Sequence, residues 1–138
     1  MKKNFKAALI IDNHKISKWQ EEALEEIEDL VNIKLVLNCK NTKTQRKIIK
    51  NFFYYLINFF TLKNHKTKKT KLNFNYKKNI DFFCNYEGNW QIIPNNIVQK
   101  INDNKIEIII KFGMSLLRVN DNISEIPIFS YHHGDPSK

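Results

Sequence analysis

The chain has 138 residues, 42% of them hydrophobic and 12% aromatic, and a formal net charge of +9 at pH 7. This length suits one domain with one core, and the composition excludes an intrinsically disordered chain, a collagen-like fibre and a disulfide scaffold. The longest apolar stretch, residues 52–62, is about half as long as a bilayer-spanning helix. We therefore expect no membrane crossing, and the lack of a signal-peptide pattern favours the cytoplasm.

Almost all of the positive charge comes from lysine, because Arg46 and Arg118 are the only arginines. Lys, Asn and Ile have A/T-rich codons and dominate the chain, so a coding bias explains the lysines without any partner. Arginine is also preferred for planar contacts to phosphates and bases, which makes this charge weak evidence for nucleic-acid binding. Cys39 and Cys84 lie far apart without metal-ligand spacing, which predicts free thiols and no metal site.

Residues 1–40 are predicted to form a strand, a helix and a second strand. The apolar run at residues 7–11 is typical of a strand buried on both faces of a parallel sheet, and residues 12–14 end it. Ser17 and Gln20 have the spacing of a capping box, and apolar residues then recur at helical spacing from Trp19 to Val31. Residues 33–37 form the next strand, and the short connections predict a right-handed parallel crossover.

A second helix is predicted from about Thr44 to Leu62, where Ile48, Phe52 and Leu56 recur at helical spacing. Its stripe of Phe and Tyr favours a core face or a subunit contact. Residues 63–78 carry seven lysines without an apolar period, which is typical of a solvated loop. The alternative is a phosphate-tracking patch in which Phe74 and Tyr76 stack on bases, and we do not favour it.

The remaining residues alternate between predicted strands and helices. Residues 80–84 form a short strand, residues 88–94 a loop or turn, and Asn95 or Asn96 caps a helix that ends near Asp103. Residues 106–112 form the strongest strand, a short helix follows at residues 114–118, and residues 126–131 form the last strand. This alternation predicts an α/β domain over residues 1–138, with a Rossmann-like, open and mainly parallel sheet flanked by helices.

Titratable residues follow the last predicted strand in the sequence SYHHGD, residues 130–135. The carboxyl ends of parallel strands are where open α/β sheets bind ligands, and a histidine there can exchange a proton near neutral pH. Glycine-rich phosphate loops, a GxSxG elbow and an HExxH pair are all absent from the sequence. The plainer alternative is a pair of exposed histidines without a catalytic role.

The segment from Lys105 to Lys138 resembles the N-terminal domain of the folate-dependent formyltransferases, which include methionyl-tRNA formyltransferase and the sugar N-formyltransferases. In that family a buried strand ends in an aromatic-Gly step, a short Leu-containing helix follows, and the next strand ends in an Asn-x-His motif. Residues 108–113, 116–117 and 128–132 match these features. The string SYHHGDPSK is most similar to a subgroup with a His-His-Gly-Asp motif, and the segments IIDN and ISKWQEEALEEI are similar to the same subgroup.

The resemblance implies that His132 is the catalytic histidine. Ser130 stands where the family has an oxyanion-holding Asn, and its hydroxyl is a shorter, single donor. Four residues would contact the pterin of the formyl donor, 10-formyltetrahydrofolate: Phe112, Gly113, Leu116 and Leu117. The acceptor would be a small-molecule amine or a nucleotide sugar, whose neutral amine attacks the formyl carbon while His132 stabilises charge or carries a proton.

In the family, the catalytic Asp lies a few tens of residues beyond the histidine, which here falls after Lys138. We therefore expect a partial domain, incomplete at its C-terminal end, that binds folate analogues weakly or not at all and has no transferase activity. The last strand is expected to be partly uncovered, which favours self-association into a homo-oligomer. Two other classes stay open: a basic nucleic-acid-binding module and a catalytically inactive interaction domain.

Overall fold

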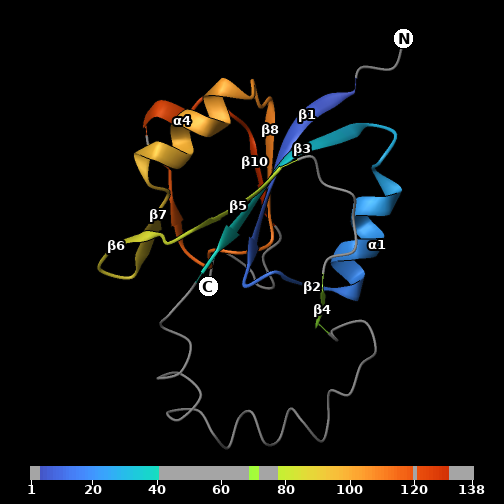
Figure 1. Ribbon diagram of the computed structural model, residues 1–138, viewed down its shortest axis with the longest axis horizontal. Helices are drawn as coiled ribbons and strands as arrows, with labels where there is room; N and C mark the ends of the chain where they lie inside the picture. Colours follow the sequence, from blue (N-terminus) through green and yellow to red (C-terminus); the bar gives the residue numbers. More distant parts are fainter. Residues whose placement is uncertain (1–3, 41–68, 72–77, 120, 131–138) are drawn as a thin grey trace, which may run out of the picture.

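The computed structural model describes residues 4–40, 69–71, 78–119 and 121–130. Its centre is a parallel five-stranded arrangement in the spatial order β5, β3, β1, β8, β10 (Figure 1). The strands are β1 (Phe5–Asp12), β3 (Val31–Cys39), β5 (Asn79–Phe82), β8 (Ile108–Lys111) and β10 (Ile128–Ser130). The prediction of one mainly parallel α/β sheet is confirmed.

The central strand β1 is buried because it is covered on both faces. Its alternate residues Ala8 and Ile10 belong to a core that includes Ile97 and Ile101 of helix α4 (Asn95–Asp103). The residues between them face a second core, which includes Leu24 of helix α1 (Lys18–Glu26). The two helices therefore lie on opposite faces of the sheet (Figure 1), and this double cover explains the continuous apolar run.

Helix α1 begins as the sequence predicts. Gln20 Oε1 accepts a hydrogen bond from the Ser17 backbone N–H at 2.7 Å, which is the capping-box contact. The strand before it ends in a tight turn at Asn13 and His14, whose φ angles are both positive. A short strand β2 (Lys15–Ser17) follows, antiparallel to the end of β1, and pairs with β4 (Lys69–Lys71).

Three sequence predictions are wrong in detail. Residues 88–94 do hold a turn, at Gly88 with φ +60°, but they also hold strand β7 (Trp90–Ile92), which forms a hairpin with β6 (Asn85–Glu87). Residues 69–71 lie in β4 rather than in a loop. Pro94, not an asparagine, precedes the first residue of α4. For the two short strands, the period-2 signal was too short to distinguish three strand residues from a loop. The cap was assigned to an asparagine because Asn is a preferred N-cap residue.

The predicted helix at residues 114–118 is also wrong. Met114 has a left-handed φ of 56°, and strand β9 (Leu117–Arg118) follows, parallel to β7. The backbone N–H of Gln91 donates to Leu116 O at 2.7 Å, and the Arg118 guanidinium contacts Glu87 Oε2 at 2.7 Å. These tertiary contacts favour an extended segment. A short 3-10 helix, η2 (Asp121–Ile123), leads toward β10. The predicted helix at residues 44–62 lies outside the described residues.

Strand β10 is partly uncovered within the described part of the chain, as expected. Phe129 is 60% exposed, and an apolar groove of about 720 Å³ separates α1 from β8 and β10. Ile27 and Ile108 line it from the two sides. Self-association through this face stays a prediction. None of the described helices is long and apolar enough to cross a membrane.

Candidate functional site

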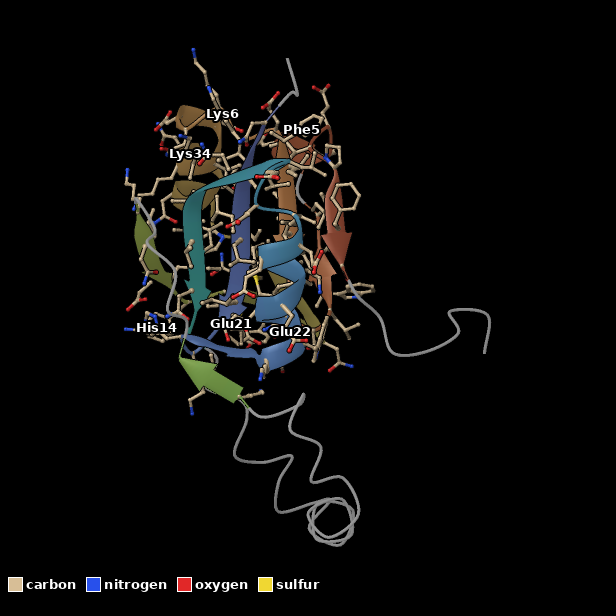
Figure 2. The ribbon with its side chains drawn as sticks, turned by 90° about the vertical axis from the view of Figure 1, so that its right-hand side faces the viewer. Phe5, Lys6, His14, Glu21, Glu22 and Lys34 are labelled. Atoms are coloured by element: carbon tan, nitrogen blue, oxygen red, sulfur yellow. The ribbon has the colours of Figure 1, made fainter. Side chains whose placement is uncertain are left out.

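Polar side chains gather at the edge of the sheet where the parallel strands end. Figure 2 shows this edge at the bottom of the view, beside His14 and the start of α1. Open α/β sheets bind their ligands at this edge, so it is the natural place to look for a site. The side chains divide into two groups, one between β1 and β8 and the other across β1, β3 and β5.

The first group is built around a close contact between β1 and the segment after β8. Asp12 Oδ1, at the end of β1, accepts a hydrogen bond from the Met114 backbone N–H at 3.1 Å. Lys111 Nζ donates to the carbonyl oxygen of Met114 at 2.9 Å. Phe112 and Gly113 both donate their backbone N–H to Ile10 O, at 2.9 and 3.0 Å. The segment after β8 is therefore held in one conformation by its neighbours.

Asp12 and Lys111 form an electrostatically perturbed pair. Burial raises the pKa of the Asp12 carboxyl group, while the Met114 N–H and the positive charges of Lys69 and Lys111 oppose this shift. Burial lowers the pKa of the Lys111 ammonium group, and the charge of Asp12 opposes that shift. Both pKa values are thus shifted toward neutral pH, and such shifts are common at functional sites.

The second group is a hydrogen-bonded network centred on Asn38, which is completely buried. Asn38 Oδ1 accepts a hydrogen bond from the His14 backbone N–H at 2.7 Å, and its Nδ2 donates to Asp81 Oδ1 at 2.7 Å. The same Nδ2 lies 2.8 Å from His14 Nε2. Because the backbone contact fixes which amide atom is the oxygen, Asn38 positions both His14 and Asp81.

The proton on His14 decides which contact its ring makes. In a neutral tautomer without a proton on Nε2, this atom accepts from Asn38 Nδ2. In the protonated ring, Nε2–H donates instead to Asp81 Oδ1, which lies 3.0 Å away. Lys40 Nζ completes the network at 2.8 Å from Asp81 Oδ2. The three charged side chains are about half exposed, so a ligand at the edge of the sheet can reach them.

Asp81 provides a test of this network in the pH dependence of stability. Its hydrogen bonds with Lys40 and Asn38, together with the His14 charge, lower its pKa from 3.8 to about 2. A depressed pKa stabilises the folded state above the unfolded-state pKa, and this contribution is lost as pH falls through the folded-state value. We therefore expect Asp81→Asn to remove up to about 1 kcal/mol of the free energy of unfolding at pH 6, after discounting for solvent screening.

The measurement is urea denaturation at several pH values between 6 and 2. The difference between the wild type and Asp81→Asn should shrink as pH falls from about 4 to 2, because Asp81 becomes protonated there. Asp103→Asn, at the exposed end of α4, is the matched control and should not change the slope. A difference that persists unchanged at pH 2 would contradict the role of the Asp81 charge.

The two cysteines are free and buried, in agreement with the sequence prediction. The structure brings them together, since they belong to one core cluster and Cys84 contributes to the pKa shift of Cys39. Burial, with the neighbouring Cys84, raises the pKa of the Cys39 thiol to about 12. A thiol with this pKa is not a nucleophile at neutral pH. Among the described residues, no group of three or more His, Cys, Asp or Glu side chains is arranged to hold a metal ion.

The structure describes five of the six predicted site residues: Ser130 ends β10, Phe112, Gly113 and Leu116 follow β8, and Leu117 begins β9 of the three-stranded sheet. Ser130, the last residue of β10, is the register partner of Lys111 in β8, and its buried Oγ has no hydrogen-bond partner within the described structure. Leu116 is 44% exposed, whereas Leu117 packs against the core from β9. Phe112 packs edge-on against Trp19, with ring centroids 5.8 Å apart. His132 lies outside the described residues.

Gly113 has a structural role that the sequence did not reveal. A Cβ atom at this position would lie 2.6 Å from both Asp12 Oδ1 and the Ile11 carbonyl carbon. The side of Gly113 where a side chain would project is therefore occupied by β1. This residue permits the approach of two strand ends, and any ligand that contacts it has to do so from another side.

Sequence reasoning missed the network of His14, Asn38, Lys40 and Asp81, because its members come from three separate segments. The one signal was a polar residue, Asn38, inside the buried run of β3. Comparison with known proteins adds no assignment for these residues. No protein-family model matches the chain, and no curated protein or solved structure does so either.

Proposed function

We propose that this chain is a formyltransferase-like protein that receives a formylated folate at the carboxyl ends of β8 and β10. The proposal is supported chiefly by one observation: Ser130 lies beside the end of β8, with a buried hydroxyl group that has no hydrogen-bond partner among the described residues. A buried hydroxyl group without a partner is costly. A formyl oxygen that displaced the atoms now covering this hydroxyl group would give it one.

The neighbouring residues suit one side of a flat, partly apolar ring system. Leu116 is 44% exposed in the segment that follows β8, and Phe112 offers a partly buried aromatic ring. The backbone of the segment between them is held in place by Asp12 and Lys111, so it would not have to be ordered when a ligand binds. His132 follows Ser130 by two residues and would act on the formyl group, as the family resemblance implies.

Titration of the ¹⁵N-labelled chain with 5-formyltetrahydrofolate, a stable analogue of the donor, tests this proposal by NMR. Concentrations up to the millimolar range detect weak binding, which is the outcome that distinguishes this proposal from the expectation of no binding at all. The amide signals of Phe112, Gly113, Leu116 and Ser130 should shift together. Shifts confined to other parts of the chain, or no shifts at all, would refute the proposed site.

Two variants make the test specific for the hydroxyl group of Ser130. Ser130→Ala should weaken 5-formyltetrahydrofolate binding several-fold, because the formyl oxygen loses its donor. The same variant should bind unsubstituted tetrahydrofolate like the wild type, because that ligand has no formyl oxygen. Ser124→Ala is the matched control, since the Ser124 hydroxyl already donates to Asp121 O at 2.7 Å. Equal losses for both folates would contradict a contact to the formyl group.

A further inference from the structure

The apolar groove on the α1 side of the sheet gathers exposed hydrophobic side chains. All eleven residues that line its volume of about 720 Å³ are apolar. Phe129 is 60% exposed, Leu30 48% and Phe5 36%, so the groove holds three of the seven large hydrophobic side chains that are exposed in the described part of the chain. A contiguous apolar surface of this kind marks an interaction site.

The groove lies where a second helix would cover the sheet. Leu24 of α1 packs over β1, and α1 is the one helix on this face among the described elements. Figure 2 looks onto this face, with α1 in front of the sheet, β10 beside it and Phe5 at the upper end. Parallel sheets have helices over both faces, so the vacant place over β8 and β10 has the form of a helix-binding groove.

The shape of the groove argues against a second copy of the chain as its occupant. A two-fold symmetric contact would place one groove against the same groove of the other molecule, and two concave surfaces do not fill each other. Strand β10 is the last strand of the sheet in the described structure. Pairing of two such edges would extend the sheet and leave the groove open. A convex apolar element, such as the apolar stripe of a helix, is required to fill it.

The charge of the α1 wall selects the kind of helix. Residues 18–29 hold six acidic side chains and one basic side chain, Lys18, so this wall has a formal charge of −5 in a chain whose net charge is +9. The acidic residues are Glu21, Glu22, Glu25, Glu26, Glu28 and Asp29. The last turn of α1 has no basic residue, so acidic side chains lie at the negative end of the helix dipole, which is unfavourable. A basic partner would offset this cost.

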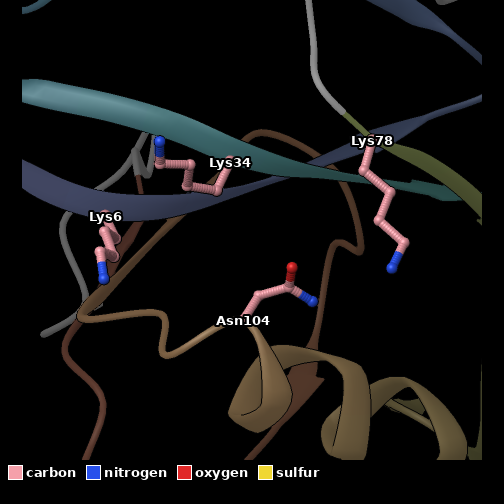
Figure 3. Close-up of a pocket in the computed structure, with 4 residues that line it drawn as sticks. All are labelled: Lys6, Lys34, Lys78 and Asn104. Carbon is pink, nitrogen blue, oxygen red and sulfur yellow. The ribbon is translucent and has the colours of Figure 1, made fainter.

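The lysines at the Phe5 end of the sheet line a different surface. Lys6 follows Phe5 in the chain, but it lines a hollow beside Asn104, at the end of α4 on the opposite face (Figure 3). Lys34 lines the same hollow and is the extra residue of a β-bulge in β3. None of the residues that line the apolar groove is charged. The acidic wall of α1 therefore dominates the groove.

We propose that this groove binds an amphipathic helix of a partner protein, with an apolar stripe that fills the groove and flanking lysine or arginine side chains that face the acidic residues of α1. Glu26 follows Ala23, which lines the groove, by three positions, so the two are neighbours on the helix surface. Apolar contacts supply the affinity, and the charges supply the choice of partner. The proposal does not depend on folate binding.

Two designed peptides test the choice of partner on the whole chain. Both are helices of about 18 residues with one leucine stripe, and they differ in carrying either lysine or glutamate beside it. We expect the lysine peptide to bind at least tenfold more tightly, although the net charge of +9 attracts the glutamate peptide. The NMR signals of Ile27, Leu30 and Phe129 should shift. Equal or tighter binding of the glutamate peptide, or shifts confined to other residues, would overturn the proposal.

Variants locate the contact. Phe129→Ser should weaken binding of the lysine peptide about tenfold, and the double variant Glu22→Gln with Glu26→Gln about fivefold. Phe83→Ser and Asp103→Asn are the matched controls, because Phe83 is 61% exposed after the edge strand β5 and Asp103 ends α4 on the opposite face. Equal losses in the variants and their controls would refute the groove. Light scattering tests the rival occupant: a dimer that the lysine peptide dissociates would show that a second copy fills the groove, against the proposal.

Discussion

Gly113→Ala is expected to lower the free energy of unfolding by about 3 kcal/mol, more than most single substitutions in this chain. The added Cβ would lie 2.6 Å from the Ile11 carbonyl carbon and 2.8 Å from the Asp12 backbone nitrogen. These are backbone atoms of the central strand, so they cannot move aside like the end of a flexible side chain. Either β1 or the segment after β8 has to shift.

Thermal unfolding measures this effect, and we expect the melting temperature to fall by about 10 °C for a chain of this size. Gly88→Ala is the matched control. Gly88 lies in the β6–β7 turn with φ +60°, and a Cβ there would meet nothing within 4 Å. Gly88→Ala should lower the free energy of unfolding by only about 1 kcal/mol, because alanine is less stable than glycine in a left-handed conformation. Equal effects of the two variants would show that the close contact at Gly113 is not strained by a methyl group.

The same variant should also disturb the proposed folate site. The contact from Asp12 Oδ1 to the Met114 N–H depends on the distance between β1 and the segment after β8. A shift of this segment would move Leu116 relative to Ser130. NMR shifts of Leu116 in Gly113→Ala, without ligand, would therefore report the coupling between packing and site geometry.

The central strands were predictable from the sequence because burial on both faces leaves a continuous apolar run. Residues 7–11 show it without interruption, and residues 35–37 continue it in β3 after Lys34. The capping box of α1 was predictable for a similar reason, since it depends on two residues three positions apart. These signals are local. The residues that create each signal lie within a few positions of one another in the sequence.

The short strands and both polar sites could not be predicted in this way. Strand β9 exists because its residues pair with β7, which lies about 25 residues earlier in the chain. The position of Lys34 depends on a β-bulge, and the sequence of residues 33–35 does not predict one. The network around Asn38 joins segments separated by 24 and 43 residues. In each case the deciding interaction is between segments distant in the sequence.

Asn38→Leu is expected to lower the free energy of unfolding by about 2–3 kcal/mol, although leucine is similar in size and apolar. The variant removes the acceptor of the His14 N–H and one donor to Asp81 Oδ1. Unpaired polar groups near a buried position cost more than the lost hydrogen bond itself. Urea denaturation at pH 7 measures the loss. Asn79→Leu is the control: its exposed amide lies 3.5 Å from His14 Nδ1, and we expect a change below about 0.5 kcal/mol.

Asn38→Asp separates positioning from simple packing, because a carboxylate keeps the shape of the side chain. One carboxylate oxygen can still accept the His14 N–H, but the second takes the place of the amide that donates to Asp81. Two carboxylates this close repel each other, which raises the folded-state pKa of the pair above the unfolded-state value. Stability should therefore improve relative to the wild type as pH falls from 7 to 5. A loss independent of pH would mean that Asn38 fills space and does not organise the charges of His14 and Asp81.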